Sequence, residues 1–214
     1  MEKIDVNTMK QMLIRASEMI IEKEPYLTEI DTVIGDGDHG KGMKRGFTAL
    51  KNLLKGTEYS ELDTLCREAG LELLKSMGGA SGVIFGTMFL GGVNVLPHEY
   101  QADTAHIVSY FEEGEKAVER RGRTKPGQKT MLDAFYPAVV AMKTAADRGE
   151  ILEAVFEEGA RGAAEGAEAS SRLKSEVGRS KNFHEASVGL PDPGAVSTSL
   201  IFAAFADELR KEKD

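Results

Sequence analysis

The sequence predicts an all-α domain of about eight helices, and three observations lead to that fold class. Apolar residues recur at helical spacing in segments that cover most of the chain. Alternation of apolar and polar residues, which indicates a half-buried strand, is almost absent. The length of 214 residues allows a single domain with a substantial core, and no repeat, low-complexity tract or internal linker divides it. We therefore expect residues 1–214 to form one domain.

Composition narrows the classes of function. With 41% hydrophobic and 29% charged residues, the chain is an ordinary globular sequence. Its net charge of −8 argues against binding to nucleic acid or to an anionic membrane, because both need basic surfaces. No apolar run reaches the length of a membrane span, and the charged N-terminus lacks a signal-peptide core. Cys66 is the single cysteine, so no internal disulfide can form, and we expect a cytoplasmic protein.

The first two helices flank the most unusual stretch of the chain. Asp5 or Asn7 can cap the first helix, which we expect to end before Pro25 because proline interrupts helical hydrogen bonding. The second helix is predicted from about residue 42 to residue 54, and Gly56 suits its C-terminus.

The next two helices surround a glycine pair. A third helix opens at Ser60 and ends before Gly78, with Cys66 in its apolar stripe as an inert core thiol. Residues 78–92 are apolar and rich in glycine, so a buried strand and a buried helix both fit. Small residues four or five positions apart favour a helix that packs closely against its neighbours.

Four further helices complete the chain. The fifth follows Asp103, and the sixth begins at Thr130, which forms a capping-box pattern with Asp133. The seventh is predicted over residues 151–173 and the eighth over residues 195–211. These assignments leave one long connection, which lies between the last two helices.

That connection, residues 177–194, has few apolar anchors. A loop of such length inside a compact domain is usually functional or disordered. This one carries Arg179, His184 and the string Asp192-Pro-Gly194, so a functional loop is favoured.

Three carboxylates, Asp31, Asp36 and Asp38, lie within eight positions and are interleaved with glycines. Carboxylate oxygens suit Mg²⁺ or Ca²⁺, and Mg²⁺ commonly combines one or two of them with substrate phosphates. Met43 and Phe47 follow at helical spacing, which indicates a helix N-terminus, and such an end attracts anions. Loop carboxylates before a glycine-rich helix start therefore predict a magnesium–phosphate site.

Two other interpretations of this stretch have to be weighed. A calcium loop of the EF-hand type does not fit, because neither Asp36 nor Asp38 starts the required spacing. A solvated acidic turn fits the local residues and stays open. The glycines at positions 78–79 are a second and weaker candidate for a phosphate-binding turn.

Four strings give the chain a resemblance to the nucleotide-binding (L) subunit of dihydroxyacetone kinases over essentially its whole length. They are Ile34-Gly-Asp-Gly-Asp-His-Gly40, Gly78-Gly-Ala-Ser-Gly82, Lys129-Thr-Met-Leu-Asp-Ala134 and Asp192-Pro-Gly-Ala195. Four ordered strings at family-like separations are far more specific than any one of them. The resemblance implies an eight-helix antiparallel bundle or barrel with the nucleotide site at one open end.

The resemblance also implies the residues of the site. Asp31, Asp36 and Asp38 would hold a pair of Mg²⁺ ions that bridge the phosphates of ADP or ATP. The residues around the nucleotide would be His39, Gly40, Lys41, Gly42, Ala80, Ser81, Gly122, Thr130, Met131, Arg179, Asp192, Pro193 and Gly194. No catalytic nucleophile is expected in this chain, because phosphoryl transfer relies mainly on positioning and charge stabilisation.

The activity that the resemblance implies is that of an ADP/ATP-binding subunit, which passes the γ-phosphoryl group to a small ketose held on a separate K subunit. We favour a scheme in which ADP stays bound and is rephosphorylated by a phosphohistidine protein of the phosphotransferase system, the M subunit, over exchange with free ATP. A related ketose such as erythrulose is an alternative substrate, and a nucleotide-loaded regulatory binding module is an alternative function. The oligomeric state is open, with a homodimer as one option.

Two departures from the family pattern concern the phosphate turn and the long loop. Lys41-Gly42 replaces the usual Thr-Asn, and Lys41 is either a phosphate contact or an extended surface side chain. The residues after Arg179 also differ, which bears on the substrate and the partner more than on the nucleotide. His39 is either a phosphohistidine relay or, as we favour, a hydrogen-bonding group beside the phosphates.

Overall fold

The computed structural model describes residues 2–178 and 180–211, with only the backbone of His184, and it is all-α as predicted. Eight α-helices lie in these residues: α1 (Val6–Ile34), α2 (His39–Gly56), α3 (Leu62–Met77), α4 (Gly79–Leu90), α5 (Thr104–Gly122), α6 (Leu132–Asp147), α7 (Leu152–Ser170) and α8 (Pro193–Lys211). The other described elements are two 3₁₀ segments, η1 (Val93–Val95) and η2 (Ser180–Ser187), and two strands, β1 (Lys3–Asp5) and β2 (Gln101–Asp103). The segment 78–92 is therefore mainly helix rather than strand.

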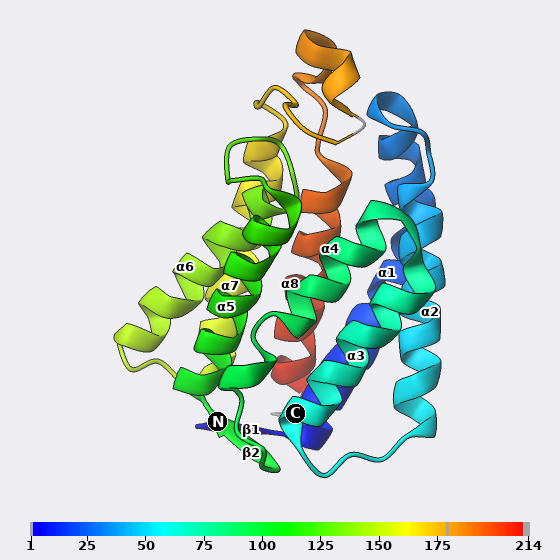
Figure 1. The fold of residues 1–214 in the computed structure, drawn as a ribbon. Helices are drawn as coiled ribbons and strands as arrows, with labels where there is room; N and C mark the ends of the chain where they lie inside the picture. Colours follow the sequence, from blue (N-terminus) through cyan, green and yellow to red (C-terminus); the bar gives the residue numbers. More distant parts are fainter. Residues whose placement is uncertain (1, 179, 212–214) are drawn as a thin grey trace.

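The helices form a closed ring, so the bundle is a barrel with two ends (Figure 1). Each helix packs against the next one along the chain, and α8 returns to pack against α1. Phenylalanines fill the interior, where the ring of Phe111 lies 5.9 Å from that of Phe156 and 5.4 Å from that of Phe202. Cys66 is also buried, and burial raises the pKa of its thiol to about 12, as expected for an inert core residue.

The starts of three helices follow the predicted capping residues. Asp5 and Asp103 each accept a hydrogen bond from the backbone N–H three residues further on, at 2.8 Å and 3.0 Å. At the start of α6, the Thr130 N–H donates to Asp133 Oδ2 at 2.6 Å, and Thr130 Oγ1 accepts from the Leu132 N–H at 3.2 Å. The bond from the Thr130 N–H to Asp133 is one half of the predicted capping box, while the Thr130 hydroxyl serves the N–H of Leu132 rather than that of Asp133. Helix α6 itself begins at Leu132, two residues after the predicted start.

The first helix does not end before Pro25, and that prediction is wrong. α1 continues through Pro25, although proline removes one hydrogen bond and crowds the preceding turn. Packing holds the second half of the helix: Leu27 is fully buried, and a side chain at Gly40 of α2 would overlap Thr28. This contact with α2 outweighs the cost of the proline and carries Asp31 to the end of the barrel.

The strands β1 and β2 are missing from the sequence prediction. They pair antiparallel, with Ile4 opposite Ala102, and both of these side chains are buried. Three residues per strand are too few for a periodic signal. The ladder lies at the lower end of the barrel in Figure 1 and ties the start of α1 to the start of α5.

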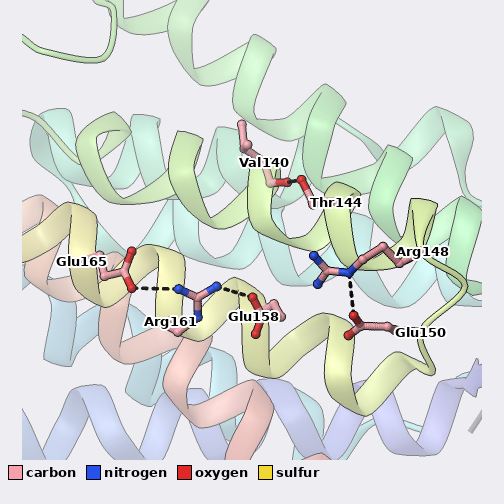
Figure 2. Close-up of polar contacts among 7 residues, drawn as sticks. All are labelled: Val140, Thr144, Arg148, Glu150, Glu158, Arg161 and Glu165. Carbon is pink, nitrogen blue, oxygen red and sulfur yellow. Dashed lines mark hydrogen bonds and ion pairs between the residues drawn. The ribbon is translucent and has the colours of Figure 1, made fainter.

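Local polar contacts line the outer side of α6 and α7 (Figure 2). Arg161 lies between Glu158 and Glu165, with Nη1 2.9 Å from Glu165 Oε1, and Arg148 donates to Glu150 at 2.7 Å across the turn between the helices. Exposed pairs of this kind contribute little to stability. None of the helices in the described residues combines the length and the apolar character that a membrane-spanning helix needs.

Helices α6 and α7 approach closely at Gly166 of α7. Pro137 inside α6 has no N–H, so the carbonyl of Asp133 lacks its helical donor. A Cβ atom at Gly166 would lie 2.1 Å from that carbonyl oxygen and 2.6 Å from Pro137 Cγ. Only glycine allows this approach, which fixes the start of α6 against α7.

We expect Gly166→Ala to lower the free energy of unfolding by about 2 kcal/mol, because the added methyl group forces the two helices apart. Gly56→Ala is the matched control. It places the same methyl group at the end of α2, where nothing lies within 4 Å, and should leave stability unchanged or slightly higher. Urea denaturation followed by circular dichroism measures both, and equal midpoints for the two variants would contradict the packing argument.

Candidate functional site at the open end of the barrel

The end of the barrel away from the strands brings the predicted site residues together (Figure 1). Four segments lie at that end: the α1–α2 loop, the start of α4, the α5–α6 connection and the segment that joins α7 to α8. These segments and the helix ends beside them carry the predicted residues that the structure describes. Arg179 falls outside the described residues.

The three acidic residues form one cluster. Asp31, Asp36 and Asp38 each offer a carboxylate oxygen, and these oxygens lie within 4.8 Å of one another. The expectation that all three belong to a loop is wrong for Asp31, which lies in the last turn of α1 because that helix passes Pro25. Asp36 and Asp38 are exposed residues of the loop that follows.

The backbone of the loop makes room for the cluster. A Cβ atom at Gly35 would lie 2.2 Å from Asp31 Oδ1, so any side chain there would displace the carboxylate. Gly37 has φ of 71°, a conformation that glycine adopts without strain. Three converging carboxylates, two of them on exposed residues, are a donor set that fits a hard divalent cation such as Mg²⁺.

Helix α2 begins at His39, whereas the sequence predicts a start near Gly42. The Asp31 carboxylate accepts a hydrogen bond from the His39 N–H at 3.0 Å and acts as a cap, although it belongs to the preceding helix. Gly40 and Gly42 are buried in the first turn, and Lys41 between them is exposed. A first helical turn has backbone N–H groups without helical partners, and these groups attract phosphate.

The start of α4 lies beside the start of α2. Gly78 and Gly79, with φ of 73° and 62°, turn the chain from α3 into α4. Arg45 of α2 donates to two carbonyls at the end of α3, one of them at 2.9 Å, and α2 also packs against α4. Ala80 and Ser81 therefore form a second helical first turn next to that of α2.

His39 links three helices beneath these turns. Its Nε2 atom lies 2.8 Å from Ser197 Oγ of α8, and its Nδ1 atom lies 3.4 Å from Ser81 Oγ of α4. Burial lowers the pKa of His39 to about 4, so the ring is neutral at neutral pH. Each ring nitrogen therefore lies within hydrogen-bonding distance of a hydroxyl group. This favours a hydrogen-bonding role for His39 over a phosphohistidine relay.

The residues before α8 lie against the α5–α6 connection. Asp192 is buried and accepts a hydrogen bond from the Ala195 N–H at 2.8 Å, so α8 begins at Pro193 rather than at Ala195 as predicted. Burial raises the pKa of Asp192 to about 7. A Cβ atom at Gly194 would lie 3.3 Å from both the backbone nitrogen and the Cβ of Met131. The two segments therefore pack directly against each other.

Gly122 and Thr130 lie at the two ends of the α5–α6 connection. Gly122 is the last residue of α5, and a Cβ atom there would lie 3.5 Å from Ile84 Cδ1 of α4. The Thr130 N–H and hydroxyl serve the cap of α6, as described above.

A comparison with protein families decides the identity of the domain, because the DAK2 domain matches residues 33–207. The chain belongs to the DAK2 domain family. The matched range contains the glycine-rich turns and the segment before α8, and Asp31 lies just before it. The resemblance noted in the sequence is thereby confirmed.

Curated relatives of this DAK2 domain include subunits and parts of kinases. The chain is 33% identical over 188 residues to the PEP-dependent dihydroxyacetone kinase 1, ADP-binding subunit DhaL, of Listeria innocua. That alignment covers 88% of this chain and 89% of the relative. It is 29% identical over 194 residues to the PEP-dependent dihydroxyacetone kinase, ADP-binding subunit DhaL, of Escherichia coli, covering 91% and 92%. The L-erythrulose kinase of Pectobacterium atrosepticum is 31% identical, with 92% of this chain but only 34% of that protein covered.

A solved structure has the same fold as this DAK2 domain. The dihydroxyacetone kinase from C. freundii, in complex with AMP-PNP and Mg²⁺, aligns with a TM-score of 0.72 at 24% identity. The alignment covers 92% of this chain and 33% of that kinase, so the chain spans about a third of it. The likeness supports the predicted all-α fold.

Sequence reasoning missed two polar side chains that form hydrogen bonds with residues of the DAK2 site or next to it. Ser197 lies in the apolar pattern of α8 and bonds to His39. Lys129 is 1% exposed and bonds to three backbone carbonyls. Lys129 opens one of the four strings of the family resemblance, which is the one signal that could have drawn attention to it.

Proposed function

We propose that residues 1–214 form the cytoplasmic ADP/ATP-binding subunit of a dihydroxyacetone-type kinase, a phosphotransferase that works only with partner subunits. The observation that carries the proposal is the position of three carboxylates beside two helix N-termini at one end of the barrel. An acidic chain repels a nucleotide unless metal ions reverse the local charge, which such a cluster makes feasible. The names of the relatives, ADP-binding subunits of dihydroxyacetone kinases, support the same function.

In this proposal Asp31, Asp36 and Asp38 hold a pair of Mg²⁺ ions. Their oxygens are the hard ligands that Mg²⁺ prefers. When bound, the metal neutralises phosphate charge, including the charge that develops during transfer. The bond from the His39 N–H orients Asp31 for this task, and Gly35 keeps space for its carboxylate.

The nucleotide phosphates would be bound by the first turns of α2 and α4. The turn at residues 39–42 and the turn at Ala80–Ser81 are proposed for this role, because a helix N-terminus favours anions. In the first of these turns the N–H groups of Gly40 and Lys41 are the candidate donors, since that of His39 is bonded to Asp31 and that of Gly42 to the Asp38 carbonyl. The exposed Lys41 adds a positive charge that can reach a phosphate. The remaining proposed contacts, around the base and sugar and over the site, are Gly122, Thr130, Met131, Arg179, Asp192, Pro193 and Gly194.

The partners in this proposal divide the reaction. A K subunit holds a small ketose that accepts the γ-phosphoryl group, and a phosphohistidine M subunit rephosphorylates the ADP that stays bound. Relatives named PEP-dependent or PTS-dependent ADP-binding subunits support the retained-ADP scheme. Erythrulose is the second candidate for the ketose, since the chain is 31% identical to an L-erythrulose kinase.

Protein purified without added nucleotide is expected to contain close to one ADP per chain after long dialysis in Mg²⁺. Several charge-assisted contacts must break together before the nucleotide can leave, so release should be slow. Acid extraction and chromatography measure the nucleotide, and a chelator should release it. A protein that emerges empty, and that works with its partner on free ATP at full rate, would instead support the exchange scheme.

A further inference from the structure

Lys129 is a buried lysine to which the proposed function gives no role. Its Nζ atom donates to the carbonyl oxygens of Ser170 at 2.8 Å, Leu173 at 3.1 Å and Leu190 at 2.6 Å. An ammonium group has three N–H donors, so the three acceptors match its full capacity. The side chain is therefore placed with a specificity that a surface lysine lacks.

The three carbonyls mark the two ends of a segment whose described residues, 174–178 and 180–189, we call the lid. The carbonyls of Ser170, the last residue of α7, and of Leu173, three residues after the helix, precede the lid, and that of Leu190 follows it. The Gly189 N–H donates to the Ser171 carbonyl at 2.7 Å, so the backbone also pairs at this place. Residues 170–173 and 189–190, which we call the stem of the lid, are thus held together by one ammonium group and one backbone hydrogen bond.

The backbone of Lys129 has a conformation that side chains rarely adopt. Its φ is 60°, in the left-handed region. The Asp133 carboxylate fixes the chain on both sides of it, accepting from the Gly127 N–H at 2.5 Å and from the Thr130 N–H at 2.6 Å. A strained backbone conformation of this kind persists only where the surrounding contacts hold it in place. Residues with such conformations are found most often at active sites and ligand sites.

The stem of the lid is joined to residues that the proposed function places over the nucleotide. The Asp192 N–H donates to Ser170 Oγ at 3.2 Å, and Ser170 is one of the three residues that Lys129 binds. Gly194 in turn lies against Met131, two residues after Lys129. A single cation therefore connects the stem, the turn at residues 192–194 and the start of α6.

We propose that Lys129 is a positioning residue that anchors both ends of the lid and thereby sets how long a nucleotide stays bound. The proposal rests on the proposed function in naming the nucleotide, whereas the anchoring of the lid stands on the contacts alone. Without the ammonium, three partly or fully buried carbonyls lose their donor, and the stem must open to let water reach them. The acidic cluster and the first turns of α2 and α4 are not part of this stem.

The test uses Lys129→Met, which keeps the length of the side chain and removes its charge and donors. The probe is a fluorescent ADP analogue released into excess ADP in Mg²⁺. We expect release from Lys129→Met to be about tenfold faster than from the wild type, because affinity changes appear mainly in the dissociation rate. Lys174→Met is the matched control, since Lys174 lies in the lid itself but pairs only with the exposed Glu185 in the contacts described, and it should release at the wild-type rate.

Hydrogen exchange of the nucleotide-free proteins provides a readout that does not need a ligand. Amides of the lid stem, Gly189 above all, should exchange faster in Lys129→Met than in the wild type, while those of α1 to α4 stay unchanged. If wild-type protein does not bind the ADP analogue, the proposed function fails, and the exchange measurement still decides whether Lys129 anchors the lid. Unchanged exchange at the stem overturns the anchor, and unchanged release with faster exchange overturns its effect on the nucleotide.

Lys129→Arg covers the case in which Lys129→Met does not fold. A guanidinium group keeps the charge but spreads its donors over a plane, so it cannot serve three carbonyls from one atom. We expect Lys129→Arg to release the ADP analogue faster than the wild type does. If Lys129→Met folds, it should release the analogue faster still. Release from Lys129→Arg at the wild-type rate, with unchanged exchange at the stem, overturns the proposal.

Discussion

Replacing Asp36 and Asp38 together with Asn is expected to lower the affinity for ADP in Mg²⁺ by about a hundredfold, with about tenfold for either change alone. Asn keeps the size of each side chain but removes the negative charge that a divalent cation requires. The carboxylate oxygens of the two residues and of Asp31 lie within 4.8 Å of one another, so losing two charges leaves one carboxylate for the metal. Isothermal titration calorimetry with ADP measures the effect.

The control for this experiment is Asp147→Asn. It removes the same charge from the exposed end of α6, where Asp147 pairs with Lys143 at 3.1 Å. This change should leave the affinity for ADP unaltered. Repeating the titration in a chelator should bring the wild type down to the affinity of the double variant. An affinity of the double variant equal to that of the wild type would remove the acidic cluster from the site.

The 214-residue chain on its own is expected to phosphorylate free dihydroxyacetone or erythrulose at least about a hundredfold more slowly than it does together with a K subunit. Phosphoryl transfer needs the acceptor oxygen close to the γ-phosphate and in line with it. The proposed residues surround metal, phosphates and base, and none of them is assigned to hold the ketose. A coupled assay with and without candidate K subunits measures the difference.

Two controls make that assay decisive. The K subunit alone must show no turnover, and the Asp36→Asn, Asp38→Asn double variant must abolish turnover by the pair. Comparing dihydroxyacetone with erythrulose in the same assay separates the two candidate ketoses. Full turnover by the chain alone would show that the ketose site lies within these residues and would end the proposed division of labour.

The caps of α1, α5 and α6 and the buried faces of the helices could be predicted because their signals are local. Asp5 and Asp103 cap the helices that follow them within three residues, and Thr130 and Asp133 do the same for α6. The apolar stripe around Cys66 likewise needs only helical periodicity. The three carboxylates are also visible in the sequence, since they stand within one short stretch of it.

The errors arise where distant segments decide the local structure. Pro25 signals a helix end, but contacts between α1 and α2 keep the helix intact and place Asp31 inside it. The early start of α2 depends on the cap that Asp31 supplies from the preceding helix, and a local reading of the glycines at 40 and 42 does not show this. Tertiary packing therefore changes the geometry of the acidic cluster without changing its members.

Some supporting contacts leave no pattern in the sequence at all. The bond between His39 and Ser197 joins residues from α2 and α8, and nothing near either residue marks the other. The ammonium of Lys129 meets carbonyls more than forty positions away, which belong to no motif because every residue has a carbonyl. The ladder of β1 and β2 is equally hidden, since each strand has only three residues.

The positions of the first strand and the last helix have a consequence for gene fusion. β1 begins and α8 ends at the barrel end opposite the acidic cluster (Figure 1). A second polypeptide joined through a linker at either end would leave the approach to the cluster clear. In two relatives the matched region is part of a longer protein: it is 34% of the L-erythrulose kinase of Pectobacterium atrosepticum and 35% of the triokinase/FMN cyclase of Rattus norvegicus. The same barrel can thus form a protein of its own or part of a longer protein while its open end stays accessible.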